Sequence, residues 1–406
     1  MSSVDFLDKL LGGVPVGWKA LGELGDLVRG NGLQKKDFTD TGVPAIHYGQ
    51  IYTHYGLSTK ETKSFVSPDL AKQLRKVNTG DVVITNTSEN LEDVGKALVY
   101  LGERQAVTGG HASVLKPGKC LLGKYFAYFT QTEIFAIEKR KFAKGIKVID
   151  VSATDMAKIK IPIPCPDHPN KSLEIQAEIV RILDTFTELT AELTAELTAE
   201  LTARTKQYKH FRDQLLSFED GSVEWKTLEH LVDINTGSKP PKIIESPTSF
   251  DYINAGTSRS GYSVASNCEG DTVTTPSRGQ GGIGYVGYQR KPFWLGPLCY
   301  KLRSIDKSVL INKYLFYFLQ SRSELLLGLK KEGGVPAVNK SDFVKLKIPV
   351  PTLEVQRRIV AVLDKFDALT NSISEGLPRE IELRQKQYAH YRDLLLNFPK
   401  PEEAAA

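Results

Sequence analysis

Apolar and polar positions follow a helical rhythm in two stretches of the chain, residues 173–213 and 353–393. In both stretches apolar side chains recur every three or four positions, which predicts an amphipathic helix with one apolar stripe. The first helix has no breaker inside it and is expected to be continuous. The second contains Gly-Leu-Pro at residues 376–378, which predicts a break or kink there.

The first helix contains Thr-Ala-Glu-Leu three times in succession, at residues 190–201. Four residues rise roughly 6 Å and turn roughly 400°, so each unit lengthens the helix by one turn and shifts its stripe by about 40°. The segment therefore suits a spacer of variable length. We expect the two helices to pair antiparallel along a seam formed by Ile175, Ile179, Phe186, Leu193, Leu197, Leu201, Ile359, Phe366, Ile373 and Ile381.

The remaining sequence has short β-like runs between Gly-, Ser- and Asn-rich turns, with helical stretches near residues 121–131 and 312–330. This predicts an α+β fold in which two tandem α/β domains are separated and linked by the two long helices, with pseudo-twofold symmetry. The expected segments are a first recognition domain, a helical spacer, a second recognition domain, and a second spacer with a tail, at residues 1–157, 158–218, 219–344 and 345–406.

An internal repeat supports this division. Lys-Ile-Lys-Ile-Pro-Ile-Pro at residues 158–164 returns as Lys-Leu-Lys-Ile-Pro-Val-Pro at 345–351, and a helix follows each copy. Through the helices the offset is constant at 180 residues, from Leu173 and Leu353 to Asp213 and Asp393. The globular parts match only loosely. A duplicated scaffold that carries two different readers of one kind of target would produce this pattern.

Composition and residue spacing argue against a metal-binding protein and against a membrane protein. A hydrophobic content of 41% and a charged content of 25% are typical of globular domains, and a net charge of +5 permits nucleic acid without requiring it. The four cysteines are far apart and no histidine stands at metal-ligand spacing, so no metal is expected. The absence of a signal sequence and of a long apolar run predicts a cytoplasmic protein that does not contact a membrane.

Polar loops in both globular parts mix cationic groups with side chains that can read base edges. The candidate DNA-binding residues are Lys35, Lys36, His47, Tyr48, Gln50, Asn86, Ser88, Lys96, His111, Lys239, Asn254, Ser258, Arg259, Ser277, Arg278 and Gln280. The glycines at residues 279–284 fit GxGxxG but lead into a strand rather than a helix, which is the wrong context for a dinucleotide. A loop close to a DNA backbone suits them better. No P-loop, nucleophile elbow or catalytic histidine pair is present, so no catalytic residue is expected.

These features together resemble the specificity subunit of type I restriction–modification systems. The likeness rests on the Lys-Ile-Pro-Ile-Pro runs, the Leu-Glu-Ile-Gln helix start at residue 173, Gly-Leu-Pro-Arg-Glu-Ile at 376 and Lys-Gln-Tyr-Ala-His-Tyr-Arg-Asp at 386, and it spans essentially the whole chain. The Thr-Ala-Glu-Leu units resemble the spacer of the IC class. The resemblance implies a non-catalytic subunit that reads a bipartite double-stranded DNA target, each domain recognising one half.

The resemblance also implies partners. Two modification subunits would methylate adenine N6 with S-adenosylmethionine, and restriction subunits would translocate and cut DNA with ATP and Mg²⁺, so this chain itself needs no cofactor. Residues 165–171 interrupt the symmetry of the two halves. Two other functions stay open from the residues alone: a methyltransferase or nuclease in its own right, which lacks an Asn/Asp-Pro-Pro-Tyr/Phe signature here, and a structural coiled-coil adaptor with protein-binding end domains.

Overall fold

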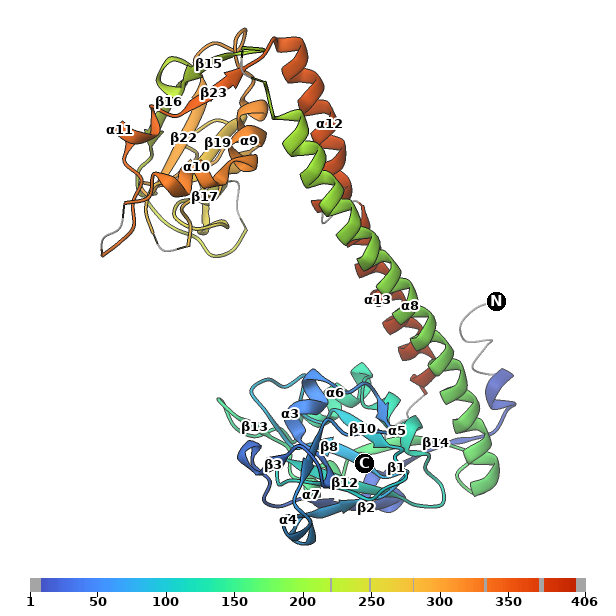
Figure 1. Cartoon of the computed structure of the whole chain (residues 1–406). Coiled ribbons are helices and arrows are strands. Elements are labelled where there is room, and N and C mark those ends of the chain that lie inside the picture. Colours follow the sequence, from blue (N-terminus) through green and yellow to red (C-terminus); the bar gives the residue numbers. More distant parts are fainter. Residues whose placement is uncertain are drawn as a thin grey trace. The chain divides into compact units, whose positions relative to one another are not determined.

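The computed structural model describes residues 9–219, 221–247, 250–279, 281–331, 334–371 and 376–398. The chain forms two compact units (Figure 1), which are residues 1–194 with 383–406, and residues 195–382. Each unit therefore combines one globular domain with parts of both long helices. The domain limits expected at residues 157, 218 and 344 stay predictions, because this grouping follows packing rather than chain order.

The first globular domain is built from short strands and helices. Its strands are β1 (Val16–Ala20), β2 (Gly25–Arg29), β3 (Phe38–Thr39), β4 (Val43–Ile46), β5 (Ser58–Thr59), β6 (Ser64–Val66), β7 (Arg75–Val77), β8 (Val82–Thr85), β9 (Thr87–Ser88), β10 (Ala97–Tyr100), β11 (Ala106–Thr108), β12 (Ala112–Pro117), β13 (Ile149–Asp150) and β14 (Lys160–Pro164). Its helices are α2 (Leu21–Leu24), the 3-10 helix η1 (Lys35–Asp37), α3 (Tyr48–Thr53), α4 (Pro68–Gln73), α5 (Gly123–Phe129), α6 (Glu133–Arg140) and α7 (Ala153–Met156).

Two five-stranded sheets form the body of this domain. One has the order β2-β12-β8-β10-β5 and the other the order β3-β6-β4-β11-β7, in which β4 and β11 run parallel. All four residues of β8 and of β10 are buried, which explains why these strands read as continuous apolar runs rather than alternating ones. The aromatic helix α5 packs its buried rings into the same core.

The second globular domain repeats the central part of the first with fewer strands. Its elements are β15 (Glu224–Thr227), the 3-10 helix η2 (Leu228–His230), β16 (Val232–Thr236), β17 (Phe250–Ile253), β18 (Tyr262–Ser263), β19 (Thr272–Pro276), β20 (Gly287–Gln289), β21 (Trp294–Leu295), β22 (Cys299–Ser304), α9 (Asn312–Ser321), α10 (Ser323–Gly328), α11 (Lys340–Phe343) and β23 (Lys347–Val350). The sheet β16-β22-β19-β20 corresponds to β2-β12-β8-β10, and the parallel pair β17 and β21 corresponds to β4 and β11.

The predicted long helices are present. The first, α8 (Pro169–Leu215), is one continuous helix that includes the Thr-Ala-Glu-Leu units. The second is described as two helices, α12 (Leu353–Asn371) and α13 (Leu377–Leu396), which confirms the interruption expected from the Gly-Leu-Pro triplet. The inserted residues 165–171 include the first turn of α8, which begins at Pro169, a residue favoured at helix starts because its missing N–H is unused there.

The same contacts fix each domain to the helix that follows it. The Asp184 carboxylate on α8 accepts from Lys124 and Tyr128, both at 2.7 Å. On α12, Asp364 accepts from Lys313 at 2.7 Å and Tyr317 at 2.5 Å. Burial raises the pKa of the Tyr128 and Tyr317 hydroxyls far above the ordinary value, so both keep their protons at neutral pH and act as donors. The repeat seen in the sequence is therefore a repeat of contacts.

Some of the predicted seam residues pack against a globular domain, and others pack against the other long helix. Ile175 and Ile179 lie in the core of the first domain, and Ile359 lies in that of the second, so these positions hold helix to domain. Phe186 stacks on Tyr391 of α13 in the first unit, with ring centroids 5.9 Å apart, and Phe366 stacks on Phe211 in the second at the same distance. Leu193, Leu197, Leu201 and Ile381 are half-buried, and Ile373 is outside the described residues.

Within the first unit the helix pair is antiparallel. Phe186 meets Tyr391, and the hydroxyl of the next residue, Thr187, lies 2.9 Å from that of Tyr388. The partner residue number falls as the α8 residue number rises, which is the register of an antiparallel pair. Figure 1 shows α13 beside α8 in this unit and α12 beside α8 in the other.

Candidate nucleic-acid interface

In the first domain, four polar and aromatic residues from three segments form one cluster, called here the first cluster: His47, Tyr48, Thr87 and His111. His47 follows β4 and caps α3, where its Nδ1 accepts from the Gly49 N–H at 3.2 Å. The Tyr48 ring lies 4.5 Å from the His47 ring and 4.7 Å from the His111 ring. Sequence positions far apart are thus brought together at the ends of β4, β8 and β11.

The two histidines of the first cluster differ in exposure. His47 is buried, and burial, followed by the nearby charges of Lys35 and His111, lowers its pKa below 6.5, so it is neutral at pH 7. His111 is exposed, and its Nδ1 lies 2.8 Å from the Thr87 hydroxyl. Because Thr87 holds one ring nitrogen, the other is free to meet a base edge or a phosphate.

Asn86 was expected to contact DNA, and the structure gives it an internal role instead. Its side chain is fully buried, donates to the Val151 carbonyl at 2.7 Å and accepts from the Ser113 hydroxyl at 2.7 Å. A buried amide with these partners presents no group to a base. The residue type suited base reading, but its place directly after an entirely buried strand puts it inside.

The other candidates of this domain lie around the first cluster. The amide of Gln50 is bonded within the domain to Ser64 at 2.6 Å, and Lys96 pairs with Asp93 at 2.5 Å beside the Tyr52 ring. Ser88 is half-buried on β9. Lys35 and Lys36 lie exposed on η1, where they are available to phosphates.

The second domain holds a corresponding group of residues, called here the second cluster: Asn254, Ala255, Arg278 and Leu298. Asn254 follows β17, and its Oδ1 accepts from the Leu298 N–H at 2.9 Å. Arg278 is exposed after β19. The glycine-rich loop beyond Arg278 packs closely on the loop that follows β17, since a Cβ added at Gly282 would lie 2.9 Å from the Gly256 nitrogen.

The remaining second-domain candidates are mostly exposed. Arg259 pairs with Asp251 at 3.1 Å and lies over the Tyr262 ring at 4.1 Å, while Lys239 and Ser258 face solvent. Ser277 is buried and is held through its backbone. Gln280 is outside the described residues.

Backbone hydrogen bonds show that the two clusters occupy the same place in the fold. Val151 N–H donates to the Asn86 carbonyl, and Val338 N–H to the Ser277 carbonyl, both at 2.9 Å. In the same way Asn86 N–H donates to His111, and Ser277 N–H to Leu298. The frame is therefore shared to the level of single hydrogen bonds.

On this shared frame the side chains differ. His47 corresponds to Asn254, Thr87 to Arg278 and His111 to Leu298, because each pair occupies the same step after matching strands. Two copies of one frame that present different hydrogen-bonding and apolar groups are suited to reading two different sequences of one polymer.

Sequence reasoning missed a pair of hairpins next to the clusters. Residues 144–151 (the first hairpin) and residues 331 and 334–338 (the second hairpin, whose residues 332 and 333 lie outside the described part of the chain) share Lys144 and Lys331, Val148 and Val335, and Val151 and Val338 at one offset of 187. That spacing was the signal in the sequence. It was hard to find because the rest of the eight residues differs.

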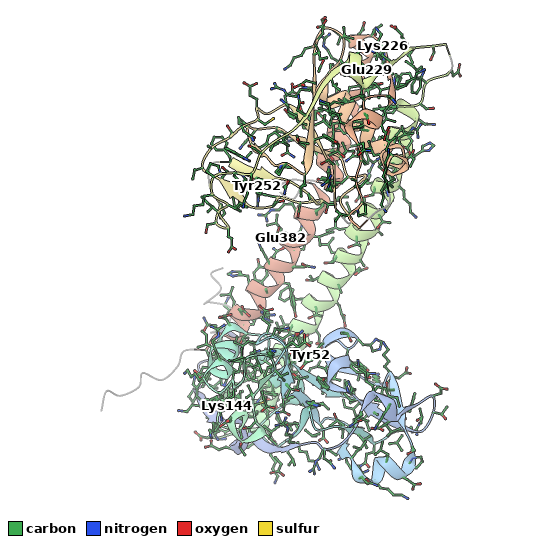
Figure 2. The ribbon with its side chains drawn as sticks, turned by 90° about the vertical axis from the view of Figure 1, so that its left-hand side faces the viewer. Tyr52, Lys144, Lys226, Glu229, Tyr252 and Glu382 are labelled. Atoms are coloured by element: carbon green, nitrogen blue, oxygen red, sulfur yellow. The ribbon has the colours of Figure 1, made fainter. Side chains whose placement is uncertain are left out.

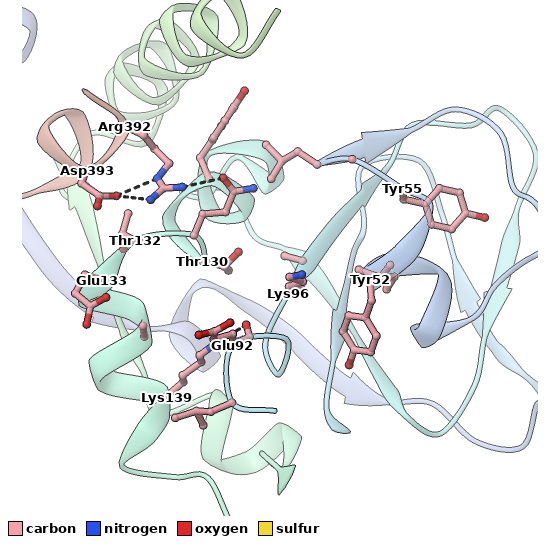
Figure 3. Close-up of a pocket in the computed structure, with 18 of the residues that line it drawn as sticks. Tyr52, Tyr55, Glu92, Lys96, Thr130, Thr132, Glu133, Lys139, Arg392 and Asp393 are labelled. Atoms are coloured by element: carbon pink, nitrogen blue, oxygen red, sulfur yellow. Dashed lines mark hydrogen bonds and ion pairs between the residues drawn. The ribbon is translucent and has the colours of Figure 1, made fainter. Parts of the chain in front are cut away.

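The first unit also contains a cavity of about 1000 Å³ (Figure 3). Tyr52, Lys96, Lys139 and Arg392 contribute to its lining. The Lys139 ammonium donates to two backbone carbonyls, and the Arg392 guanidinium pairs with Asp393 at 2.8 Å. The lining of the cavity therefore comes from both the first domain and α13.

Two stretches, residues 15–203 and 222–383, match the family model described as Type I restriction modification DNA specificity domain. The chain belongs to the family of type I restriction–modification specificity subunits. The specificity subunit of the Escherichia coli enzyme EcoR124I/EcoR124II is 38% identical over 99% of both chains, and that of E. coli EcoprrI is 31% identical over 92% of this chain and 93% of the other. The family expected from the sequence motifs is confirmed.

Solved structures share the fold. A chain from a structure of type I R-M complex assembly and conformational transition matches with a TM-score of 0.67 and 17% identity, covering 94% of this specificity subunit and 98% of that chain. The HsdS subunit from Thermoanaerobacter tengcongensis matches with a TM-score of 0.54 and 16% identity, over 94% and 96%. The predicted α+β fold with paired long helices is confirmed.

Among the residues that the structure describes, no group of three or more His, Cys, Asp and Glu side chains is placed to hold a metal ion. Within the same residues, no helix has both the length and the apolar character needed to cross a membrane.

Proposed function

We propose that this specificity subunit recognises a bipartite double-stranded DNA sequence, with the first cluster reading one half and the second cluster the other. The observation that supports this proposal most strongly is that both clusters share one frame of backbone hydrogen bonds but carry different side chains. Arg278 is suited to guanine, Asn254 to adenine, and the histidines to either purine edge or to phosphate. Exposed Lys35, Lys36 and Lys239 supply the contacts to phosphate that fix register.

The long helices act as the spacer between the two half-sites in this proposal. The support is the continuity of α8 through three identical four-residue units. One unit adds roughly 6 Å, and base pairs are roughly 3.4 Å apart, so each unit corresponds to one to two base pairs of gap.

The partners follow from the family. Two modification subunits would methylate adenine N6 with S-adenosylmethionine, and restriction subunits would cut DNA with ATP and Mg²⁺, while this chain would be non-catalytic. The two units repeat the same contacts between domain and helix, Lys124 with Asp184 and Lys313 with Asp364, so each would offer a modification subunit a similar local arrangement. Their similarity supports a stoichiometry of two.

The test is selection from a random DNA library by the complex of this chain with its modification subunits, at stated salt. We expect enrichment of two short motifs at a fixed gap. Salt-sensitive binding without any motif would contradict the proposal and favour the adaptor function. Methylation by the isolated chain would contradict its non-catalytic role.

The spacer has its own test. Deletion of residues 198–201 removes one Thr-Ala-Glu-Leu unit and is expected to shorten the gap by about one to two base pairs with both motifs unchanged. Leu197→Ala keeps the helix length and serves as the control, with an unchanged gap. An unchanged gap after the deletion would refute the spacer role.

A further inference from the structure

The two hairpins are built alike. Backbone bonds between Lys144 and Asp150, at 3.0 and 2.8 Å, close the first, and bonds between Lys331 and Ala337, at 2.9 and 3.3 Å, close the second. Each opening lysine also pairs with the aspartate of the following short helix. Lys144 lies 3.0 Å from Asp155, and Lys331 lies 2.8 Å from Asp342. Lys144 is labelled in Figure 2.

Each hairpin is tied directly to its cluster. In the first domain Asp150 pairs with Thr87, whose hydroxyl contacts His111, and the Arg29 guanidinium holds the Asp150 carboxylate at 2.7 Å. In the second domain Ala337 forms a bridge with Arg278. The hairpins are therefore continuous with the surfaces assigned above to DNA, and their bases are rigidly held.

The tip of the first hairpin presents an apolar side chain between cations. Ile146 is 97% exposed, and Lys144 and Lys147 on either side of it are exposed. Gly145 makes the turn, with a φ of +101° and no room for a Cβ, which would meet the Val148 carbonyl. An isoleucine on a rigid turn between two lysines gains nothing from the fold, because it packs against nothing in its own domain.

We propose that the first hairpin enters the major groove of its half-site and that Ile146 contacts the C5 methyl group of a thymine there. This inference rests on the proposed function. A two-stranded ribbon fits the major groove, and the thymine methyl is the apolar group on the base edges in that groove. Lys147, which is exposed beside Ile146, is placed to meet a phosphate, whereas Lys144 stays paired with Asp155.

The contact belongs to one half-site only. By the offset that aligns the hairpins, the position of Ile146 corresponds to residue 333, which is a glycine in the sequence and lies outside the described residues. A glycine offers no apolar side chain. The second hairpin consequently cannot make the same methyl contact, and the two half-sites differ in this respect.

The experiment uses the complex with modification subunits and the DNA motif selected by the wild type. Each thymine is replaced in turn by uracil, which removes only the methyl group, and affinity is measured for the wild type and Ile146→Ala. We expect one uracil to weaken wild-type binding about three- to tenfold. Ile146→Ala should lose a similar factor on thymine DNA and lose nothing more on that uracil.

Ile137→Ala is the control. It removes another exposed isoleucine, on α6 of the same domain, and should bind DNA like the wild type. The inference is overturned if Ile146→Ala binds thymine DNA as tightly as the wild type does. It is also overturned if Ile146→Ala binds more weakly but every thymine-to-uracil replacement still weakens its binding as much as it weakens that of the wild type. Both results require that the wild type selects a motif, so failure of the proposed function is recognised separately.

Discussion

Gln176 and Gln356 illustrate how single residues hold each helix to its domain. The buried amide of Gln176 accepts from Leu122 N–H at 2.9 Å and donates to the Cys120 carbonyl at 2.8 Å. Gln356 makes the same bonds with Ile311 and Val309, at 2.9 and 2.8 Å. One side chain thus satisfies an N–H and a carbonyl of the loop that precedes α5 in the first domain, and α9 in the second.

Gln176→Leu should destabilise the first unit by about 1–3 kcal/mol, because it leaves a partly buried N–H and a partly buried carbonyl without partners. Gln356→Leu should have a similar effect on the second. Urea unfolding of the full chain measures both, and Gln207→Leu, at an exposed site on α8, is the control. Midpoints equal to that of the control would show that the bonds contribute little.

Lys139 predicts a pH dependence of stability. Its ammonium donates to the Glu92 and Val94 carbonyls at 3.0 and 2.6 Å, and burial lowers its pKa from 10.5 to about 8. Between these two values the unfolded chain binds more protons than the folded one, so this residue makes stability rise with pH from about 8 to 10.5. Below pH 8 the lysine is charged in both states and the burial cost is present in full.

Lys139→Met should abolish that rise, whereas Lys141→Met, at an exposed neighbour, should keep it. The measurement is the urea midpoint of each variant between pH 7.5 and 10. Parallel curves for the wild type and Lys139→Met would contradict the lowered pKa.

At the scale of elements, α8 and α5 are joined through Asp184. Asp184→Asn weakens the bonds from Lys124 and Tyr128 together, and we expect a loss of about 1–3 kcal/mol in unfolding free energy. Glu188→Gln, an exposed change on the same helix, is the control. Thermal and urea unfolding would both report the loss. An Asp184→Asn variant as stable as Glu188→Gln would show that the bonds of Asp184 contribute little to the free energy of unfolding.

The elements also show what a sequence can reveal. The long helices were predictable because their signal is local, a stripe every three or four residues and an offset of 180 that holds from Leu173 to Asp213. Whether a stripe residue packs on a helix or on a domain was not predictable, since Ile179 and Phe186 look alike in sequence but lie in a domain core and on a neighbouring helix.

The candidate interface was predictable only in part. His47, Tyr48 and His111 were identified by residue type and do lie together, but Asn86, which was expected to contact DNA, is buried. The first hairpin was missed because its role depends on pairing with Thr87, far earlier in the chain. Pairing over such separations leaves no local pattern.

At the scale of the whole molecule, two readers on one chain should act independently. Arg278→Ala is expected to reduce discrimination at one base pair by about 1–3 kcal/mol in one half of the selected motif, because it removes a two-donor contact. His111→Leu should change the other half only. Library selection with each variant distinguishes the halves. Changes in both halves from one substitution would show that the clusters are coupled.

The first unit draws residues from both ends of the chain, residues 1–194 and 383–406. Leu395, Leu396 and Phe398 are buried in the same core as β8 and α5. During synthesis residues 9–194 therefore emerge before the second unit, and residues 395–398, which complete their core, emerge only after it. Chains cut short before Leu395 should leave the second unit intact and the core of the first one incomplete, so proteolysis of such chains should begin within residues 9–194.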